Sequence, residues 1–238
     1  MADLAPTPPP AWLAHLAGKF VVFEGPDGSG KSTQLKRLVA LAAAHALPVC
    51  EVREPGGTDV GERIRQILLD KAHSGMSLRC EMLLYMASRA QLVEKRIAPA
   101  LAANQLVIAD RFVSSTIAYQ GAAGGLPRDE IDAVTGVACG AINPDLILIF
   151  DVDEQTAAQR AGIIVAPGKG KKADSASGSL FADRMEDRSR EFRRMVRESY
   201  LAQAREEPKS HAIINAAKSP DEVWANLSQT LAERFGSR

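Results

Sequence analysis

The residues whose types and spacing most clearly indicate chemistry lie between Gly25 and Thr33, in the segment GPDGSGKST. They form a complete G-x-x-x-x-G-K-S/T pattern between an apolar run, Phe20 to Phe23, and an amphipathic helical pattern. Such a loop binds a polyphosphate, because glycines let backbone N–H groups turn inward while the helix N-terminus and the lysine add positive charge. The alternative, a glycine-rich turn that merely begins a helix, is disfavoured because strand, loop and helix patterns are all present.

We expect this whole phosphate loop to contact a bound nucleotide. Lys31 brings its full charge to the phosphates, and the hydroxyl of Ser32 is expected to hold a magnesium ion. The predicted nucleotide-binding residues of the loop are Gly25, Pro26, Asp27, Gly28, Ser29, Gly30, Lys31, Ser32 and Thr33.

Charged side chains also follow the next two apolar runs of the chain. Val49 to Arg53 is followed by Glu54-Pro55, and Leu106 to Ala109 is followed by Asp110-Arg111. Ligands of open parallel sheets bind beyond the carboxyl ends of the strands, so these residues predict a second anionic ligand facing the nucleotide. Structural ion pairs are the alternative for any one of these residues alone, but their joint placement disfavours it.

A third candidate lies in the long helical pattern Leu78 to Ala103. Tyr85 and Arg89 are four residues apart and therefore share one face of a helix. An aromatic ring beside an arginine can stack on a flat base and hydrogen-bond its edge. A core tyrosine beside a surface arginine is the alternative, and spacing alone favours it.

The elements that must position these residues alternate between strand and helix. This alternation predicts an α/β fold with a five-stranded parallel sheet covered by helices on both faces. The expected strands are Lys19–Glu24, Val49–Arg53, Leu106–Ala109, Leu146–Asp151 and His211–Ile214. The expected helices are Lys31–His45, Gly61–Leu69, Leu78–Ala103, Arg128–Gly140, Glu154–Ala161, Met185–Glu206 and Ser219–Phe235.

Length and composition set the domain organisation. The 238 residues, 46% of them hydrophobic, are enough for one substantial core and a small lid. We expect a flexible, proline-rich tail over residues 1–18 and a single domain over 19–238. Residues from about 160 to 184 are rich in Gly, Ala, Ser and Lys, which predicts a mobile basic lid with Arg160 and Arg184 at its ends. Loop statistics favour no specific role for its three lysines, at 169, 171 and 172.

Charge and cysteine content exclude several classes of function. Lys and Arg number 29, as do Asp and Glu, so there is no overall electrostatic preference for nucleic acid or an anionic membrane. The three cysteines form no C-x-x-C, so we expect small apolar fillers rather than a zinc site or disulfides. Nothing matches a signal peptide or membrane span, which predicts a cytoplasmic protein. The four histidines lack catalytic spacing and are expected to be structural.

Five segments together resemble thymidylate kinases of the bacterial kind. They are GPDGSGKST, REPGGT, LLYMASRAQ, DRFVSSTIAYQG and FADRMEDRSREFRRMVRESY, and they extend over most of the span from Phe20 to Leu201. The resemblance implies a P-loop NTPase three-layer sandwich that transfers the γ-phosphoryl group of ATP to dTMP, a step of dTTP biosynthesis. It also implies a magnesium ion and a homodimer.

The resemblance assigns roles residue by residue. It implies catalytic roles for Lys31, Asp110, Arg111 and Arg184, with Ser32 and Asp110 at the metal. In bacterial relatives the lid supplies the arginine that eukaryotic relatives place within the loop, and Arg184 matches it. Arg160 would contact the nucleotide. The implied dTMP-binding residues are Asp27, Arg53, Glu54, Pro55, Tyr85, Arg89, Arg111, Ser115, Thr116, Tyr119 and Gln120.

Two other functions remain open from the sequence. One is a kinase for another nucleoside monophosphate. The other is a regulatory nucleotide-binding switch that transmits only conformation. The acceptor-side arginines Arg53 and Arg111 disfavour the switch, because a protein that merely hydrolyses its nucleotide does not need them.

Overall fold

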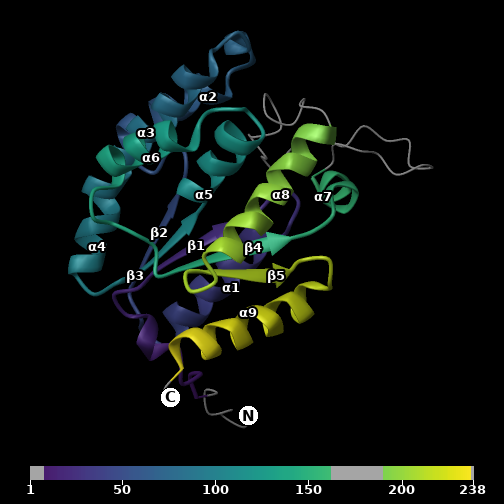
Figure 1. Cartoon of the computed structure of the whole chain (residues 1–238). Helices are drawn as coiled ribbons and strands as arrows, with labels where there is room; N and C mark the ends of the chain where they lie inside the picture. Colours follow the sequence, from purple (N-terminus) through teal and green to yellow (C-terminus); the bar gives the residue numbers. More distant parts are fainter. Residues whose placement is uncertain (1–7, 162–189, 237–238) are drawn as a thin grey trace.

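The structure, a computed structural model, describes residues 8–161 and 190–236. In this part of the chain five parallel strands form one sheet in the order β2-β3-β1-β4-β5 (Figure 1). The strands are β1 (Phe20–Glu24), β2 (Val49–Arg53), β3 (Leu106–Asp110), β4 (Leu146–Asp151) and β5 (His211–Asn215). Each agrees with the predicted strand to within one residue at either end, because a buried strand between turn residues is a strong local signal.

Helices connect the strands, as the alternating pattern predicts. They are α1 (Lys31–Ala44), α2 (Asp59–Leu69), α3 (Leu78–Leu92), α4 (Ala98–Ala102), α5 (Val113–Thr116), α6 (Arg128–Cys139), α7 (Glu154–Arg160), α8 (Arg190–Glu206) and α9 (Pro220–Phe235). The single helix predicted over Leu78–Ala103 is interrupted by a π-helical turn at Val93–Ile97. A second π-helical turn, Ile117–Ala122, follows α5, and the helical segment they form was not predicted.

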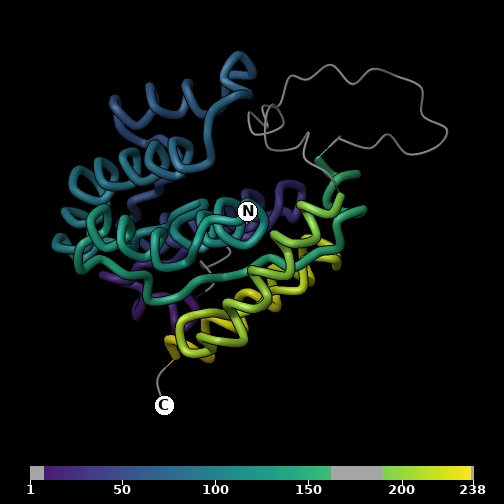
Figure 2. Tube along the Cα trace, turned by 45° about the horizontal axis from the view of Figure 1, so that its top comes forward, coloured from purple at the N-terminus to yellow at the C-terminus, as the bar shows by residue number. Residues whose placement is uncertain are grey.

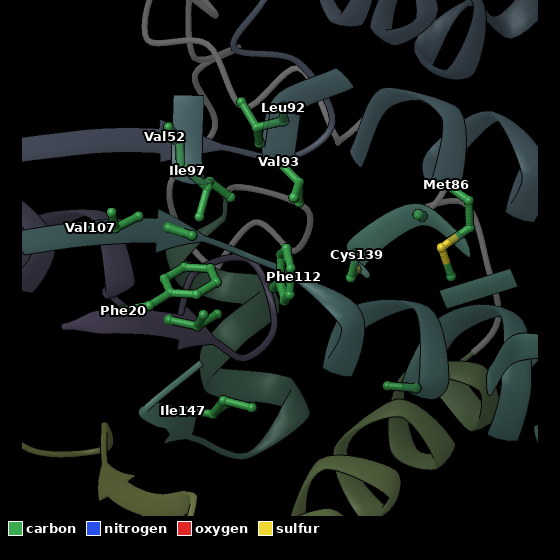
Figure 3. Packing of buried hydrophobic residues seen from close by; sticks show 14 of the residues in the cluster. Phe20, Val52, Met86, Leu92, Val93, Ile97, Val107, Phe112, Cys139 and Ile147 are labelled. Atoms are coloured by element: carbon green, nitrogen blue, oxygen red, sulfur yellow. The ribbon is translucent and has the colours of Figure 1, made fainter. Parts of the chain in front are cut away.

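The sheet is the middle of three layers. Successive side chains of β1 point to opposite faces, so Phe20 and Val22 belong to one apolar cluster while Val21 and Phe23 belong to the other. In the first cluster the ring of Phe20 meets that of Phe112 edge to face, 5.1 Å between centroids (Figure 3). The second cluster includes buried residues of α1 and α9. Figure 2 shows α2 and α9 at opposite ends of the molecule.

Burial along the strands follows their position in the sheet. Every residue of β1 is buried, whereas the edge strands β2 and β5 each contain both buried and more exposed residues. A strand in the middle of a parallel sheet covered on both faces is thus buried along its whole length. No helix among the described residues has both the length and the apolar character needed to cross a membrane.

The expectation of a flexible tail through residue 18 is wrong for its second half. Trp12, Leu13 and Leu16 are buried in the cluster formed with α1 and α9, and Ala14–Leu16 form a 3-10 turn. The backbone N–H of Gly18 donates to Asn104 O at 3.1 Å. The spacing of these three apolar residues places them on one side of the turn, a signal that the preceding prolines obscured.

Cys80 also differs from the prediction, because it is exposed, whereas an apolar filler would be buried.

The packing of this segment predicts its contribution to stability. Leu16→Ala should lower the free energy of unfolding by about 2 to 5 kcal/mol, because the side chain is fully buried and its loss leaves a cavity. Ile213→Ala, at a side chain 45% exposed on edge strand β5, is the control and should cost at most about 1 kcal/mol. Urea unfolding of both variants measures the difference. Equal losses would show that the N-terminal segment does not belong to the core.

Candidate active site

The phosphate loop lies between the end of β1 and the start of α1, where the sequence predicts it. Gly30 caps α1 in the left-handed conformation, with φ at 87°. Gly28 lies against α7 so closely that a Cβ there would come within 2.1 Å of Ala157 O. A side chain at this position would therefore collide with the backbone of α7. Ser29 Oγ is buried and has no hydrogen-bond partner within the described residues, which fits a ligand oxygen at the loop.

Lys31 is held inside this loop. Its ammonium group donates to Gly25 O at 2.8 Å and to Pro26 O at 3.0 Å, and the side chain is buried. Burial, together with the nearby positive charge of Arg111, lowers the pKa of Lys31, while neighbouring carboxylates oppose the shift. The positive charge of Lys31, which is costly to bury, therefore lies where the loop would meet a phosphate.

Ser32 and Asp110 meet at the mouth of the loop from two different elements. Ser32 Oγ, at the start of α1, donates to Asp110 Oδ2, at the end of β3, at 3.4 Å. Over residues 8–161 and 190–236, no three His, Cys, Asp or Glu side chains form a group able to hold a metal ion by themselves. One hydroxyl and one carboxylate fit magnesium, which usually takes one or two protein ligands and completes its shell with water and phosphate oxygens.

Arg111 lies between the phosphate loop and a neighbouring pocket. Its Nη2 donates to Asp27 Oδ1 at 2.7 Å, and its Nη1 donates to Ser115 Oγ at 3.2 Å and Tyr200 Oη at 3.4 Å. Burial opposes the charge of Arg111, but Tyr119 and Asp27 outweigh it and hold its pKa well above the usual value. Arg111 therefore stays cationic at the point where the loop and the pocket meet.

Glu24 is a buried carboxylate that sequence analysis placed in a strand without giving it a role. It accepts hydrogen bonds from Phe112 N at 2.8 Å, Ser115 N at 3.1 Å, Ser115 Oγ at 2.6 Å and Tyr200 Oη at 3.0 Å. Burial raises the pKa of Glu24, and Arg111 and the donors counteract that shift. An acidic residue in an otherwise apolar central strand was the available signal, since a carboxylate is buried only where it finds partners.

The pocket beside the phosphate loop brings together most of the predicted dTMP-binding residues. Pro26 and Asp27 form its loop side, and residues of α3, α5, the π-helical turn after α5, α7 and α8 form much of the rest. The predicted residues that line it are Asp27, Glu54, Tyr85, Arg89, Arg111, Ser115, Thr116, Tyr119 and Gln120.

Arg89 is not the surface arginine that its spacing alone favoured. It is 1% exposed and forms an ion pair with Glu54, with Nη2 and Oε2 2.6 Å apart. Its Nη2 also donates to Phe112 O at 3.1 Å and Thr116 Oγ1 at 3.2 Å. Burial raises the pKa of Glu54, whereas Arg89 lowers it. The pair joins the segments after β2 and β3 to α3 beneath the pocket.

Arg53 and Pro55 do not line this pocket. Arg53, half-exposed at the end of β2, donates through Nη2 to both carboxylate oxygens of Glu62, at 2.9 and 3.0 Å. Pro55 follows a cis peptide bond, and its carbonyl accepts a hydrogen bond from Arg65 at 2.9 Å. The segment after β2 therefore differs from the prediction. Glu54 lines the pocket, whereas Arg53 is paired with Glu62 of α2.

One face of α8 lines the pocket, and sequence analysis did not single it out. Phe192, Arg193, Val196 and Arg197 come from this helix, and their spacing of one and four residues is that of a helix face. Arg197 donates to both oxygens of Asp151 at the end of β4, at 2.6 and 3.0 Å. The helical periodicity of these residues could have predicted that they share one side of the helix, but not that this side lines the pocket.

A second cavity lies on the other side of the phosphate loop. It is lined by Gly28, Ser29, Gly30 and Thr33 of the loop, and by Arg160 and Lys218 among others. Arg160 Nη1 donates to Ala216 O at 2.7 Å, which fixes it between α7 and the segment after β5. The prediction for Arg184, and residues 162–184 of the predicted lid, fall outside the described residues.

Comparison with known proteins agrees with this arrangement. The family model described as thymidylate kinase matches residues 23–227. A thymidylate kinase from Symbiobacterium thermophilum is 40% identical over 215 residues, which cover 90% of this chain and 92% of the relative. One from Pseudomonas syringae pv. tomato is 39% identical over 218 residues, which cover 92% of this chain and 97% of the relative.

Structural comparison gives the same result. The crystal structure of thymidylate kinase from Ehrlichia chaffeensis aligns with a TM-score of 0.68 at 28% sequence identity, over 90% of this chain and 98% of that one. The predicted P-loop fold is thereby confirmed. The match of fold, of phosphate loop and of sequence over 90% of the chain shows that this chain belongs to the thymidylate kinase family.

Proposed function

We propose that this chain transfers the γ-phosphoryl group of ATP to dTMP, giving ADP and dTDP. The observation that carries the proposal is that the pocket and the phosphate loop share residues. Pro26 and Asp27 belong to the loop and also line the pocket, and Arg111 bridges the two. A nucleoside monophosphate in the pocket would therefore end with its phosphate beside the phosphates of the donor. The direct test is coupled detection of ADP with dTMP as acceptor and magnesium present.

The arrangement of cations suits phosphoryl transfer. The transition state is loose, so the enzyme contributes mainly by positioning the two reactants and neutralising their charge. Two unit charges about 4 Å apart repel by roughly 4 kcal/mol at an effective dielectric near 20. Lys31 on the donor side and Arg111 on the acceptor side reduce this repulsion. Ser32 and Asp110 would hold magnesium, which supplies further neutralisation of the donor phosphates.

The rest of the pocket suits a nucleoside. Tyr85, Tyr119 and Phe192 provide aromatic surface. The ring centroids of Tyr119 and Phe192 lie 6.2 Å apart. Asp27 is the acidic group near the expected sugar. A regulatory switch would have no use for such a pocket next to its phosphate loop, so the pocket favours the kinase over that alternative.

The Arg53–Glu62 ion pair is half-exposed, and such pairs contribute only about 0 to 1 kcal/mol, so Arg53 can exchange Glu62 for an acceptor phosphate at little cost. The role of Arg184 rests on the family resemblance alone.

A homodimer is part of the proposal. Leu83 on α3 is 52% exposed and Val137 on α6 is 89% exposed, on two helices that pack against each other. We propose that a second copy of this chain covers the exposed side chains of Leu83 and Val137. Sedimentation equilibrium should give twice the chain mass, and a Leu83→Glu, Val137→Glu double variant should be monomeric, because buried charge opposes association. A wild-type chain that is monomeric at every concentration would contradict the dimer.

Lys31 gives the clearest test of the phosphate loop. Lys31→Ala should lower kcat by orders of magnitude while the protein stays folded, because the charge facing the transferring phosphate is lost. Lys36→Ala, on the exposed face of the same helix, is the matched control and should retain activity. Circular dichroism checks the fold of both variants. Near-normal turnover by Lys31→Ala would show that the loop does not act on the donor.

Tyr85 tests the position of the base. Tyr85→Ala should weaken dTMP binding by about 1 to 3 kcal/mol, the range for loss of one aromatic ring stacked on a base. Tyr85→Phe keeps the ring and should bind dTMP nearly as the wild type does. Isothermal titration calorimetry measures both affinities. If both variants bind dTMP with wild-type affinity, Tyr85 does not contact the base.

A further inference from the structure

Gln120 and Glu81 form a buried pair at the edge of the acceptor pocket. Gln120 lies in the π-helical turn after α5 and lines the pocket, and Glu81 lies in the first turn of α3. The amide nitrogen of Gln120 donates to Glu81 Oε1 at 2.8 Å. Gln120 is 2% exposed and Glu81 is 1% exposed, so the two side chains have little freedom to rearrange.

The chemistry of this pair fixes the direction of the Gln120 amide. A carboxylate only accepts hydrogen bonds, so the NH2 end of the amide must face Glu81 and the carbonyl end must face elsewhere. None of the described residues donates a side-chain hydrogen bond to Gln120 Oε1. The carbonyl oxygen is therefore the end that Gln120 offers to a ligand in the pocket.

An acceptor in this position distinguishes between pyrimidine bases. Thymine and uracil carry a proton on N3 between two carbonyl oxygens, whereas cytosine has a bare N3 beside an amino group. Arg89 lines the same pocket and, as a guanidinium, can only donate hydrogen bonds. A donor and an acceptor that both reach one edge of the base would complement a carbonyl and an N3–H, and both would be mismatched with the amino group and bare N3 of cytosine.

We propose that Glu81 sets the base selectivity of this site by holding the Gln120 carbonyl toward the pocket, so that the site takes a pyrimidine with a proton on N3. Glu81 is thus a positioning residue that acts through Gln120 and does not itself line the pocket. This inference rests on the proposed function, because it concerns the acceptor of that reaction.

The test compares three acceptors that differ at the base. In the wild type, kcat/KM should be much higher for dTMP than for dCMP. In Glu81→Gln the new amide can either accept from Gln120 as the carboxylate does or donate to Gln120 Oε1, so the Gln120 amide is no longer held in one orientation and can present its NH2 group to the pocket. The dTMP:dCMP ratio of kcat/KM should then fall at least about tenfold, the effect of one mismatched hydrogen bond. The dTMP:dUMP ratio should not change, because both bases carry N3–H.

Two further variants separate this role from a structural one. Glu94→Gln makes the same chemical change at an exposed position and should leave both ratios unaltered. Gln120→Met removes the amide, so it should lower the dTMP:dCMP ratio by itself, and adding Glu81→Gln to it should change the ratio no further. An additional change in the double variant would show that Glu81 acts by another route.

The outcomes distinguish the inference from the proposed function. Absence of ADP formation with dTMP in the wild type would overturn the kinase proposal, while calorimetric affinities for dTMP and dCMP would still test the selectivity. A wild type that phosphorylates dTMP and dCMP equally would retain the kinase and overturn the role of Glu81. Equal losses with all three acceptors in Glu81→Gln, with both ratios preserved, would also overturn it.

Discussion

The arrangement of the site depends on one buried charge, the carboxylate of Glu24 at the end of the central strand. A carboxylate without partners is costly to bury, and this one is stabilised by four hydrogen bonds from the segment after β3 and from α8. Two come from backbone N–H groups of Phe112 and Ser115, which fixes the path of the chain directly after Arg111. The strand that leads into the phosphate loop thus also determines where the acceptor-side segment begins.

The same carboxylate orients Arg111 through two hydroxyl groups. Ser115 and Tyr200 each have a single hydroxyl proton, and both protons are directed at Glu24 Oε2, at 2.6 and 3.0 Å. Their lone pairs are then available to accept from Arg111 Nη1. Arg111 has a positive φ of 73°, which is uncommon outside glycine, so its position requires such support. The carboxylate of Glu24 thus orients the Arg111 guanidinium group through Ser115 and Tyr200.

Local sequence patterns predicted the strands and the phosphate loop, whereas the resemblance to thymidylate kinases supplied most of the pocket residues. The glycine spacing of the phosphate loop and the apolar runs need no knowledge of tertiary contacts. The pairs Glu24–Tyr200 and Glu81–Gln120 join residues far apart in the chain, and no local pattern shows that they meet. For Arg53 the prediction gave the correct position, at a strand end. It did not identify the partner, Glu62, which comes from the following helix. The buried Trp12 shows that a composition signal, here proline, can hide a packing signal of a few residues.

Helix α8 connects the two ends of the site. Phe192 and Val196 line the acceptor pocket, and Tyr200, a further turn along the same face, bonds Glu24 and accepts from Arg111. Arg197 ties the helix to the end of β4 through Asp151. A shift of α8 against the sheet would therefore alter the pocket wall and the support of Arg111 together, because one rigid element carries both. Binding of the acceptor and orientation of the arginine beside its phosphate are in this way two consequences of the same helix packing.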